Sequence, residues 1–176
     1  MVQTDAFAAY KKLFGPNRAI QHYFCMAHIR RKFDEAFRTD PQRAAWAVRH
    51  IAKLYAIEKR IREADPPLSE NLVVEMRIAE SVPLLEELHR WLAEEHPKVL
   101  PASPIGKAIA YALPLMEGMK LYTLHGQLQI DNNLIENTIR PIALGRKNYL
   151  FTGTHGTAQN TAMIYSLFAT CKLHQV

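Results

Sequence analysis

The densest group of chemically useful side chains lies in a short segment near the end of the chain. Residues 131–140 read DNNLIENTIR, and Arg146 and Lys147 follow a few positions later. Arg140 comes one helical turn after Glu136, where it could hold that carboxylate or reach a phosphate oxygen. A carboxylate surrounded by amides and cations makes this segment the first candidate site.

A purely structural interpretation of the same segment stays open. Asn133 followed three residues later by Glu136 is also a capping box, in which both side chains satisfy backbone N–H groups at a helix start. A capping box does not require Asn132, Asn137 or Arg140. These additional polar residues favour a functional segment.

A second acidic residue lies where a strand is expected to end. Val2-Gln3-Thr4 is typical of a short strand, Asp5 follows it, and residues 6–10 are predicted to be helical. Residues 20–25 have the β-branched and aromatic content of a second strand, and residues 26–37 predict a helix. Asp5 is therefore expected at the carboxyl end of a strand.

The middle of the chain predicts helices almost throughout, from Pro41 to about His125. Apolar residues recur there at helical spacing, in the stripes Val48, Ile51, Tyr55, Ile61 and Leu85, Leu88, Trp91, Leu92. Both tryptophans, Trp46 and Trp91, belong to such stripes and are expected in the core. The predicted turns, caps and helix breaks are Gly15-Pro16-Asn17, Pro66-Pro67, Pro83, Pro97, Pro101, Ser103-Pro104 and Pro114.

The last part of the chain is predicted to contain both strands and helices. Residues 127–130 and 148–151 are strand candidates, a brief helix between them is expected to end at Pro141, and a final helix covers about residues 157–173. The predicted order is β–α–β–α, a long helical block, and β–α–β–α. The expected fold class is α+β and predominantly helical.

Composition limits the class of protein. The chain has 176 residues, of which 48% are hydrophobic and 22% charged, which is enough for a sizeable core and too apolar for a disordered tail. Two cysteines far apart suggest a reducing compartment, and the cytoplasm is the default. The first twenty residues carry no signal-peptide core, and no apolar run is long enough for a membrane span.

Charge is unevenly distributed along the chain. The net charge is +5, but residues 10–62 hold thirteen Lys and Arg against four Asp and Glu, whereas residues 63–100 hold three against nine. Lys and Arg that neutralise phosphates release counterions, so the first third is a candidate nucleic-acid surface. The alternative is the solvated side of amphipathic helices.

Several separated motifs, in order, resemble the insertion-sequence-66 family of bacterial transposases. The motifs are residues 130–151 together with Gln3-Thr4-Asp5, Cys25-Met26-Ala27-His28, Arg30-Arg31-Lys32-Phe33, residues 100–109 (LPASPIGKAI) and Tyr165-Ser166-Leu167. The resemblance covers nearly the whole chain, and motifs in sequence are more specific than any one alone.

The resemblance implies a ribonuclease-H-like core with an Asp, Asp, Glu triad, interrupted by a large all-α insertion. Residues 1–40 would form the first part of the core, residues 41–125 the insertion and residues 126–176 the last part. Asp5 matches the second aspartate and Glu136 the glutamate. Such carboxylates hold two Mg²⁺ ions about 3.5–4 Å apart, for which Mn²⁺ substitutes, in DNA cleavage and strand transfer.

The chain departs from the family pattern at the first aspartate of the triad. That residue lies on an earlier strand in the family, and Asp34, Asp40 and Asp65 fall in helix or loop contexts with no strand-end signature. Asp131 is expected to assist the start of the Glu136 helix instead. The ribonuclease-H-like core is thus expected to be incomplete, and the chain to be the carboxyl-terminal part of a transposase, inactive alone.

Supporting roles follow from the resemblance and from charge. Arg30, Arg31, Lys32, Arg140, Arg146 and Lys147 are candidate DNA contacts, and Cys25, His28, Asn132 and Asn133 are candidate supporting residues. Cys25 and His28 could instead merely pack a strand against a helix. Cys171 and His174 repeat their spacing, so a zinc site is a further, weaker alternative.

The expected partners are DNA, both transposon ends and target, and further copies of the chain. A membrane is not expected. The competing function is a non-catalytic remnant that binds DNA or a partner transposase through its basic face. DNA binding by such a remnant would survive Glu136→Ala and weaken when Arg30 and Arg31 are removed.

Overall fold

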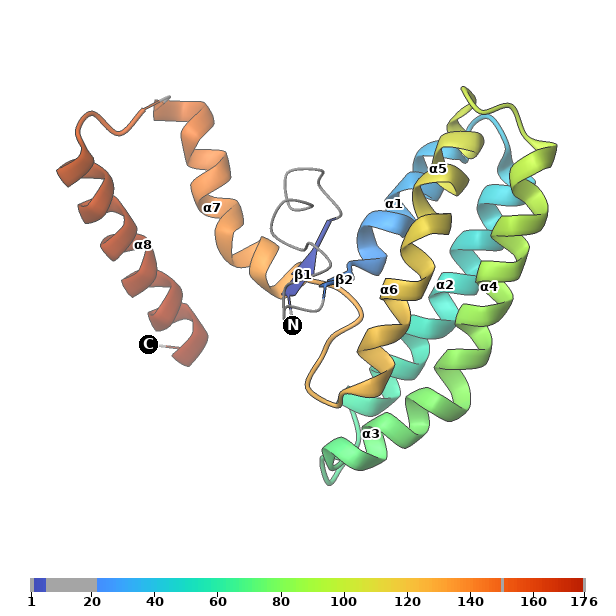
Figure 1. Cartoon of the computed structure of the whole chain (residues 1–176). Helices are drawn as coiled ribbons and strands as arrows, with labels where there is room; N and C mark the ends of the chain where they lie inside the picture. Colours follow the sequence, from blue (N-terminus) through green and yellow to red (C-terminus); the bar gives the residue numbers. More distant parts are fainter. Residues whose placement is uncertain (1, 6–21, 150, 176) are drawn as a thin grey trace, which may run out of the picture. The chain divides into compact units, whose positions relative to one another are not determined.

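The computed structural model describes residues 2–5, 22–149 and 151–175, which form two compact units, residues 1–132 and 133–176 (Figure 1). Each unit is described by itself. The helix expected at residues 6–10 and the turn at residues 15–17 lie outside the described residues.

Two short parallel strands open the first unit. β1 (Val2–Thr4) pairs with β2 (His22–Phe24) in the register Val2 to His22 and Thr4 to Phe24. Thr4 and Tyr23 are buried. Both strands agree with the sequence predictions. A two-stranded sheet is marginal alone, so the helices around it must stabilise it.

Helix α1 (Met26–Ala36) follows β2 directly and buries Met26, Ile29, Phe33 and Ala36, which share one helical face. Helix α2 (Pro41–Arg62) begins with proline at its first position, and the Asp40 carboxylate accepts a hydrogen bond from the Arg43 backbone N–H at 3.1 Å. α2 ends before Pro66-Pro67, as expected.

Pro83 does not break the next helix but changes its geometry. Helix α3 (Glu70–Met76) runs through a π-helical segment, η2 (Arg77–Ser81), into α4 (Val82–Glu95). Proline cannot donate the hydrogen bond of an α-helical turn, and the wider turn before it accommodates this loss. The 3₁₀ turn η3 (His96–Lys98) follows.

The second half of the helical block is a series of short helices. α5 (Pro104–Ala112) leads into the 3₁₀ turn η4 (Leu113–Leu115), α6 (Met116–Met119) and the 3₁₀ turn η5 (Lys120–Leu124). Pro114 lies in η4, where the α-helical pattern is interrupted, as expected.

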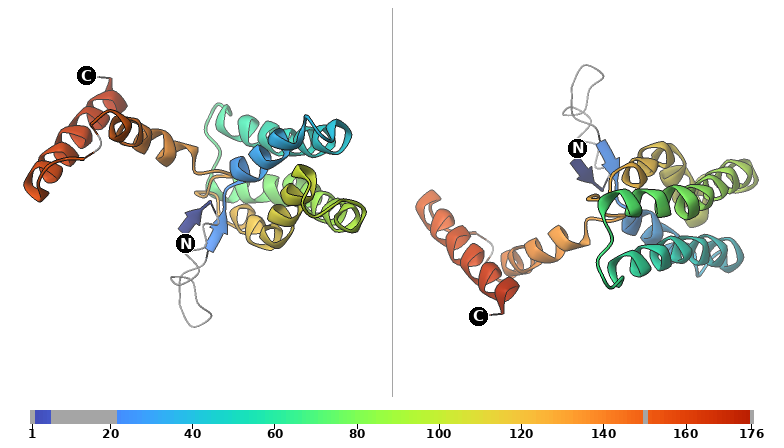
Figure 2. Two further views of the ribbon diagram at one scale, coloured as in Figure 1. Left: turned by 90° about the horizontal axis from the view of Figure 1, so that it is seen from above. Right: turned by 90° about the horizontal axis from the view of Figure 1, so that it is seen from below.

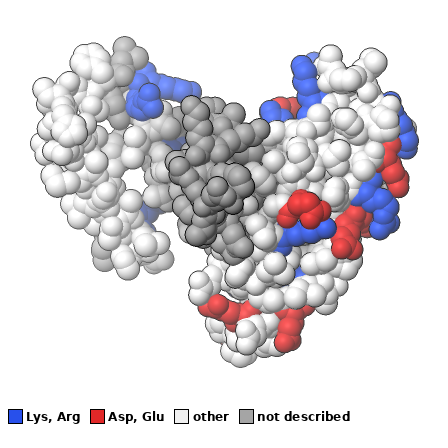
Figure 3. Space-filling view, viewed as in Figure 1, with Lys and Arg blue, Asp and Glu red and all other residues white. Residues whose placement is uncertain are grey.

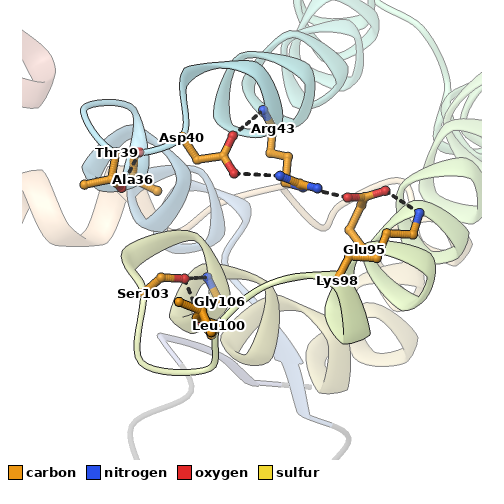
Figure 4. A network of polar contacts seen from close by, with 9 residues as sticks. All are labelled: Ala36, Thr39, Asp40, Arg43, Glu95, Lys98, Leu100, Ser103 and Gly106. Atoms are coloured by element: carbon orange, nitrogen blue, oxygen red, sulfur yellow. Dashed lines mark hydrogen bonds and ion pairs between the residues drawn. The ribbon is translucent and has the colours of Figure 1, made fainter.

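Polar contacts join the ends of these helices (Figure 4). Ser103 caps α5 by accepting from the Gly106 N–H at 3.1 Å, as the sequence predicted. The Arg43 guanidinium reaches Glu95 of α4 at 2.6 Å, and Lys98 reaches the same carboxylate at 2.8 Å. These two cations lower the pKa of Glu95, Lys98 having the larger effect.

The core of the first unit lies between α1, α2, α4 and α5, which run side by side in all views (Figures 1 and 2). Its fully buried residues include Phe33, Leu54, Leu88 and Ile109. Trp46 and Trp91 stack at 4.3 Å between ring centroids and pack against this core. The helical block predicted over residues 41–125 is therefore confirmed.

The second unit differs from its sequence prediction. It consists of α7 (Asn133–Tyr149), with Pro141 inside it, and α8 (His155–His174). A brief helix ending at Pro141 and a strand at residues 148–151 were wrong, as was the strand at residues 127–130, which forms a turn and loop. Among the described residues only β1 and β2 pair as strands, so neither segment belongs to the sheet.

The fold is thus predominantly helical with a two-stranded parallel sheet in the described part of the chain. None of the described helices is long and apolar enough to cross a membrane.

Candidate active site

The carboxyl ends of the two strands form the candidate site of the first unit. Asp5 directly follows β1 and Cys25 directly follows β2. Because the strands are parallel and Thr4 pairs with Phe24, both residues come at the same edge of the sheet. Ligands of parallel sheets bind at this edge in many folds.

Side chains on β1 anchor the strand that leads to Asp5. The Thr4 hydroxyl lies 2.6 Å from His22 Nε2. The Gln3 amide donates to the carbonyl oxygens of Phe24 at 3.3 Å and Gln129 at 3.1 Å. Burial lowers the pKa of His22, which favours the neutral ring beside Thr4. The last residue of β1 is therefore well fixed.

A tyrosine from the insertion reaches the main chain of Asp5. The Tyr111 hydroxyl, on α5, donates a 2.7 Å hydrogen bond to the Asp5 carbonyl oxygen. Burial raises the pKa of Tyr111, the Asp5 and Cys25 charges add to that shift, and Arg31 opposes it. No local sequence signal could have revealed this contact, because the two residues are 106 positions apart.

The segment before α7 lies against the end of β2. The Met26 N–H donates to the Ile130 carbonyl at 3.0 Å, and the Asn132 N–H lies 3.5 Å from Cys25 Sγ. Burial raises the pKa of the Cys25 thiol. A buried, protonated thiol that accepts a backbone hydrogen bond agrees with the packing role that the sequence left open.

Asp131 makes a contact that the sequence did not predict. The Tyr55 hydroxyl of α2 donates to Asp131 Oδ2 at 2.8 Å. Burial, followed by this hydrogen bond, raises the pKa of Tyr55. Asp131 was expected to assist the start of the Glu136 helix. The structure adds a direct link from its carboxylate to the insertion.

A buried ion pair holds the end of the insertion. Arg77 in η2 contacts both oxygens of Glu58 at 2.9 and 2.6 Å, and both side chains are nearly inaccessible. Arg77 also donates to the carbonyls of Tyr122 at 3.1 Å and His125 at 2.9 Å. Arg77 therefore joins η2 to α2 and to the segment around η5.

The second unit carries Glu136 in the first turn of α7. At 100° per residue, Glu136, Arg140 and Lys147 share one face of this helix. Ile135, Ile139 and Ile142 form another face. Arg146, at the same angular spacing, lies on the face of the isoleucines.

Of the predicted site residues, Asp5, Cys25 and Asn132 come together in the first unit, and His28 lies in the first turn of α1 beside them. Asn133, Glu136, Arg140, Arg146 and Lys147 belong to the second unit.

Comparison with known proteins agrees with the resemblance in the sequence. Residues 1–160 match the family described as "Transposase IS66 family". The chain belongs to the IS66 family of transposases. Three proteins of Sinorhizobium fredii are similar to it. "Uncharacterized protein y4qI" and "Uncharacterized protein y4hP" are each 31% identical over the whole chain, and "Uncharacterized protein y4jD" is 29% identical over 98% of it.

The chain spans about a third of the length of these relatives, 33% of y4qI and 34% of the other two. No solved structure matches the chain.

The cations of α1 in this transposase domain differ in their surroundings. Arg30 lies 3.7 Å from Asp34, and Lys32 lies 3.3 Å from Glu35. Arg31 is exposed and makes no ion pair with a described residue. On the same unit, Lys and Arg alternate with Asp and Glu (Figure 3). Arg31 is the member of the trio whose charge is least neutralised.

Proposed function

We propose that this chain forms part of the active site of a metal-dependent DNA transposase, in which Asp5 and Glu136 are the carboxylate ligands. When bound, Mg²⁺ ions would activate the attacking hydroxyl and stabilise the leaving oxygen in phosphodiester cleavage and strand transfer. The main support for this proposal is that Asp5 follows the anchored carboxyl end of a parallel strand in an IS66 family chain.

The residues near Asp5 fit a hard cation. The Asn132 side-chain oxygen is buried and has no hydrogen-bond partner among the described residues. Carboxylate and amide oxygens suit Mg²⁺ and Mn²⁺. Asn132 and Asn133 would be polar neighbours of the metal ligands. Cys25 and His28 would support the site by packing the strand end against α1.

The basic residues of the proposed site would bind the phosphates of a DNA substrate. Arg140 and Lys147 share the helix face of Glu136 and would contact phosphates of the reacting strand. Arg146 follows on α7. Arg31, with Arg30 and Lys32 around it, would contact the DNA backbone farther along, and transposon-end and target DNA are the proposed partners of an oligomer.

The experiment uses the full-length transposase that contains this segment, supplied with transposon-end DNA and Mg²⁺ or Mn²⁺. Asp5→Asn and Glu136→Gln should each lower strand cleavage by roughly 100-fold or more, because losing a ligand costs at least as much as losing an outer-shell partner. DNA binding should remain. Glu75→Gln, which alters an exposed carboxylate of α3, is the matched control.

Full cleavage by both variants would overturn the assignment. A wild-type protein that binds DNA through Arg30 and Arg31 but never cleaves it would instead favour the non-catalytic remnant. Calorimetric titration of Mn²⁺ into wild type and Asp5→Asn separates loss of metal from loss of DNA.

A further inference from the structure

The helical insertion contacts both strands that lead to the candidate site. Tyr111 of α5 bonds the Asp5 carbonyl at 2.7 Å. Farther along, α6 passes so close to β2 that a Cβ added to Gly118 would lie 2.4 Å from the Phe24 ring. α5 itself packs along α1, the helix that continues β2 (Figure 1). The insertion is therefore built against the strand ends.

We propose that Tyr111 is a positioning residue for Asp5, through which the insertion sets the direction of the Asp5 carboxylate. This inference rests on the proposed function of Asp5 as a metal ligand. It adds a role for the insertion, which would act as one wall of the metal site.

The place of the hydrogen bond explains its effect. Strand pairing ends at Thr4, so the ladder that fixes β1 does not include Asp5. The Tyr111 hydroxyl donates to the main-chain carbonyl oxygen of Asp5 and not to its carboxylate. Fixing the carbonyl restricts rotation about the Asp5 backbone, and with it the direction of the side chain.

The donor is itself well supported. α5 buries Ile105, Ala108, Ile109 and Ala112 on its other faces, and Ser103 caps its first turn. Tyr111 is half-buried, so its hydroxyl is held between packed helix and strand end.

The test compares Tyr111→Phe with wild type in the whole chain. The variant keeps the ring and removes only the donor. Mn²⁺ affinity, measured by calorimetry, should fall on the order of 10-fold, as for other outer-shell partners. The ¹³C carbonyl resonance of Asp5 should shift as its hydrogen bond is lost. Replacing Tyr111 with 3-fluorotyrosine, which keeps the hydroxyl, should retain wild-type affinity.

Tyr55→Phe is the matched control, because it removes a hydroxyl from the same insertion that bonds Asp131 rather than Asp5. Its Asp5 carbonyl resonance and Mn²⁺ affinity should stay at the wild-type values. Equal loss of affinity in both variants would overturn the proposal, since general destabilisation would then explain it.

The variant Asp5→Asn distinguishes failure of the proposed metal site from failure of the proposed role of Tyr111. Mn²⁺ binding unchanged in Asp5→Asn would overturn the proposed metal site and, with it, the role of Tyr111. Binding lost in Asp5→Asn but unchanged in Tyr111→Phe would overturn only the positioning role. If Tyr111→Phe does not fold, the 3-fluorotyrosine protein decides, because an affinity loss with its hydrogen bond intact contradicts the proposal.

Discussion

The two units of the chain differ in how far their apolar side chains are exposed. In the first unit, Met26, Ile29 and Phe33 of α1 are 0% exposed. In the second, Leu167 and Phe168 of α8 are 62% and 68% exposed, and no described residue of α8 is buried. Since burial stabilises by about 25 cal/mol per Å² of apolar surface, the stability of the chain resides in its first unit.

The same contrast applies to polar groups. The first unit ties Asp5, Asp131 and residues 122–125 to its helices by long-range hydrogen bonds. The second unit carries Glu136 and Arg140 on α7. The long-range hydrogen bonds of the first unit thus hold its strand ends in place.

The largest predicted difference in the free energy of unfolding is between substitutions of two phenylalanines, one in each unit. Phe33→Ala removes a fully buried ring and should lower the free energy of unfolding by about 3–5 kcal/mol. Phe168→Ala, at 68% exposed, should change it by less than about 0.5 kcal/mol. Urea unfolding followed by the fluorescence of Trp46 and Trp91 measures both. A comparable loss in Phe168→Ala would show that α8 shares the core, and would break the contrast.

A buried charge gives the next effect. Arg77→Ala leaves the Glu58 carboxylate buried without its partner and should destabilise the first unit by about 3–5 kcal/mol. Arg60→Ala is the matched control, because the Arg60–Glu80 pair is exposed. Its urea midpoint should stay close to the wild-type value. Equal midpoints for the two variants would mean that the Arg77 pair contributes no more than a surface ion pair.

Helix caps offer a smaller comparison. Ser103→Ala removes the cap of α5 and should lower the free energy of unfolding of the first unit by about 1 kcal/mol. Thr154→Ala removes the equivalent cap of α8 and should leave that unfolding transition unchanged. Its effect should be confined to faster amide exchange in the first turn of α8. A shifted tryptophan transition in Thr154→Ala would indicate that the units unfold together.

The smallest effect concerns pH at the strand pair. Burial lowers the pKa of His22 below its ordinary value of 6.5, so the unfolded chain binds the proton more readily than the folded one. This contribution to stability is complete above pH 6.5 and is lost as the pH falls below it. The urea midpoint should therefore decline from pH 7 to 5 more in wild type than in His22→Asn. Parallel declines would assign the pH dependence to other groups.

The sequence predictions were reliable where a single residue determines where a helix begins or ends. Asp40 and Ser103 begin helices because their oxygens accept the first free N–H groups, and Pro66-Pro67 separates two helices. The strand at residues 148–151 failed for the opposite reason. A strand depends on a neighbour to pair with, which no single residue determines, and residues 148 and 149 instead belong to α7, which runs through Pro141.

The sequence by itself determined the family, the helical block, the first strands and the place of Asp5 at a strand end, because motifs, caps and periodicity are local. Only the tertiary structure brought Tyr111 to Asp5, Tyr55 to Asp131 and Arg77 to Glu58. These partners are far apart in the chain, and each choice depends on which helix faces pack together. The free energy of such contacts belongs to the packed unit as a whole, and no segment carries it alone.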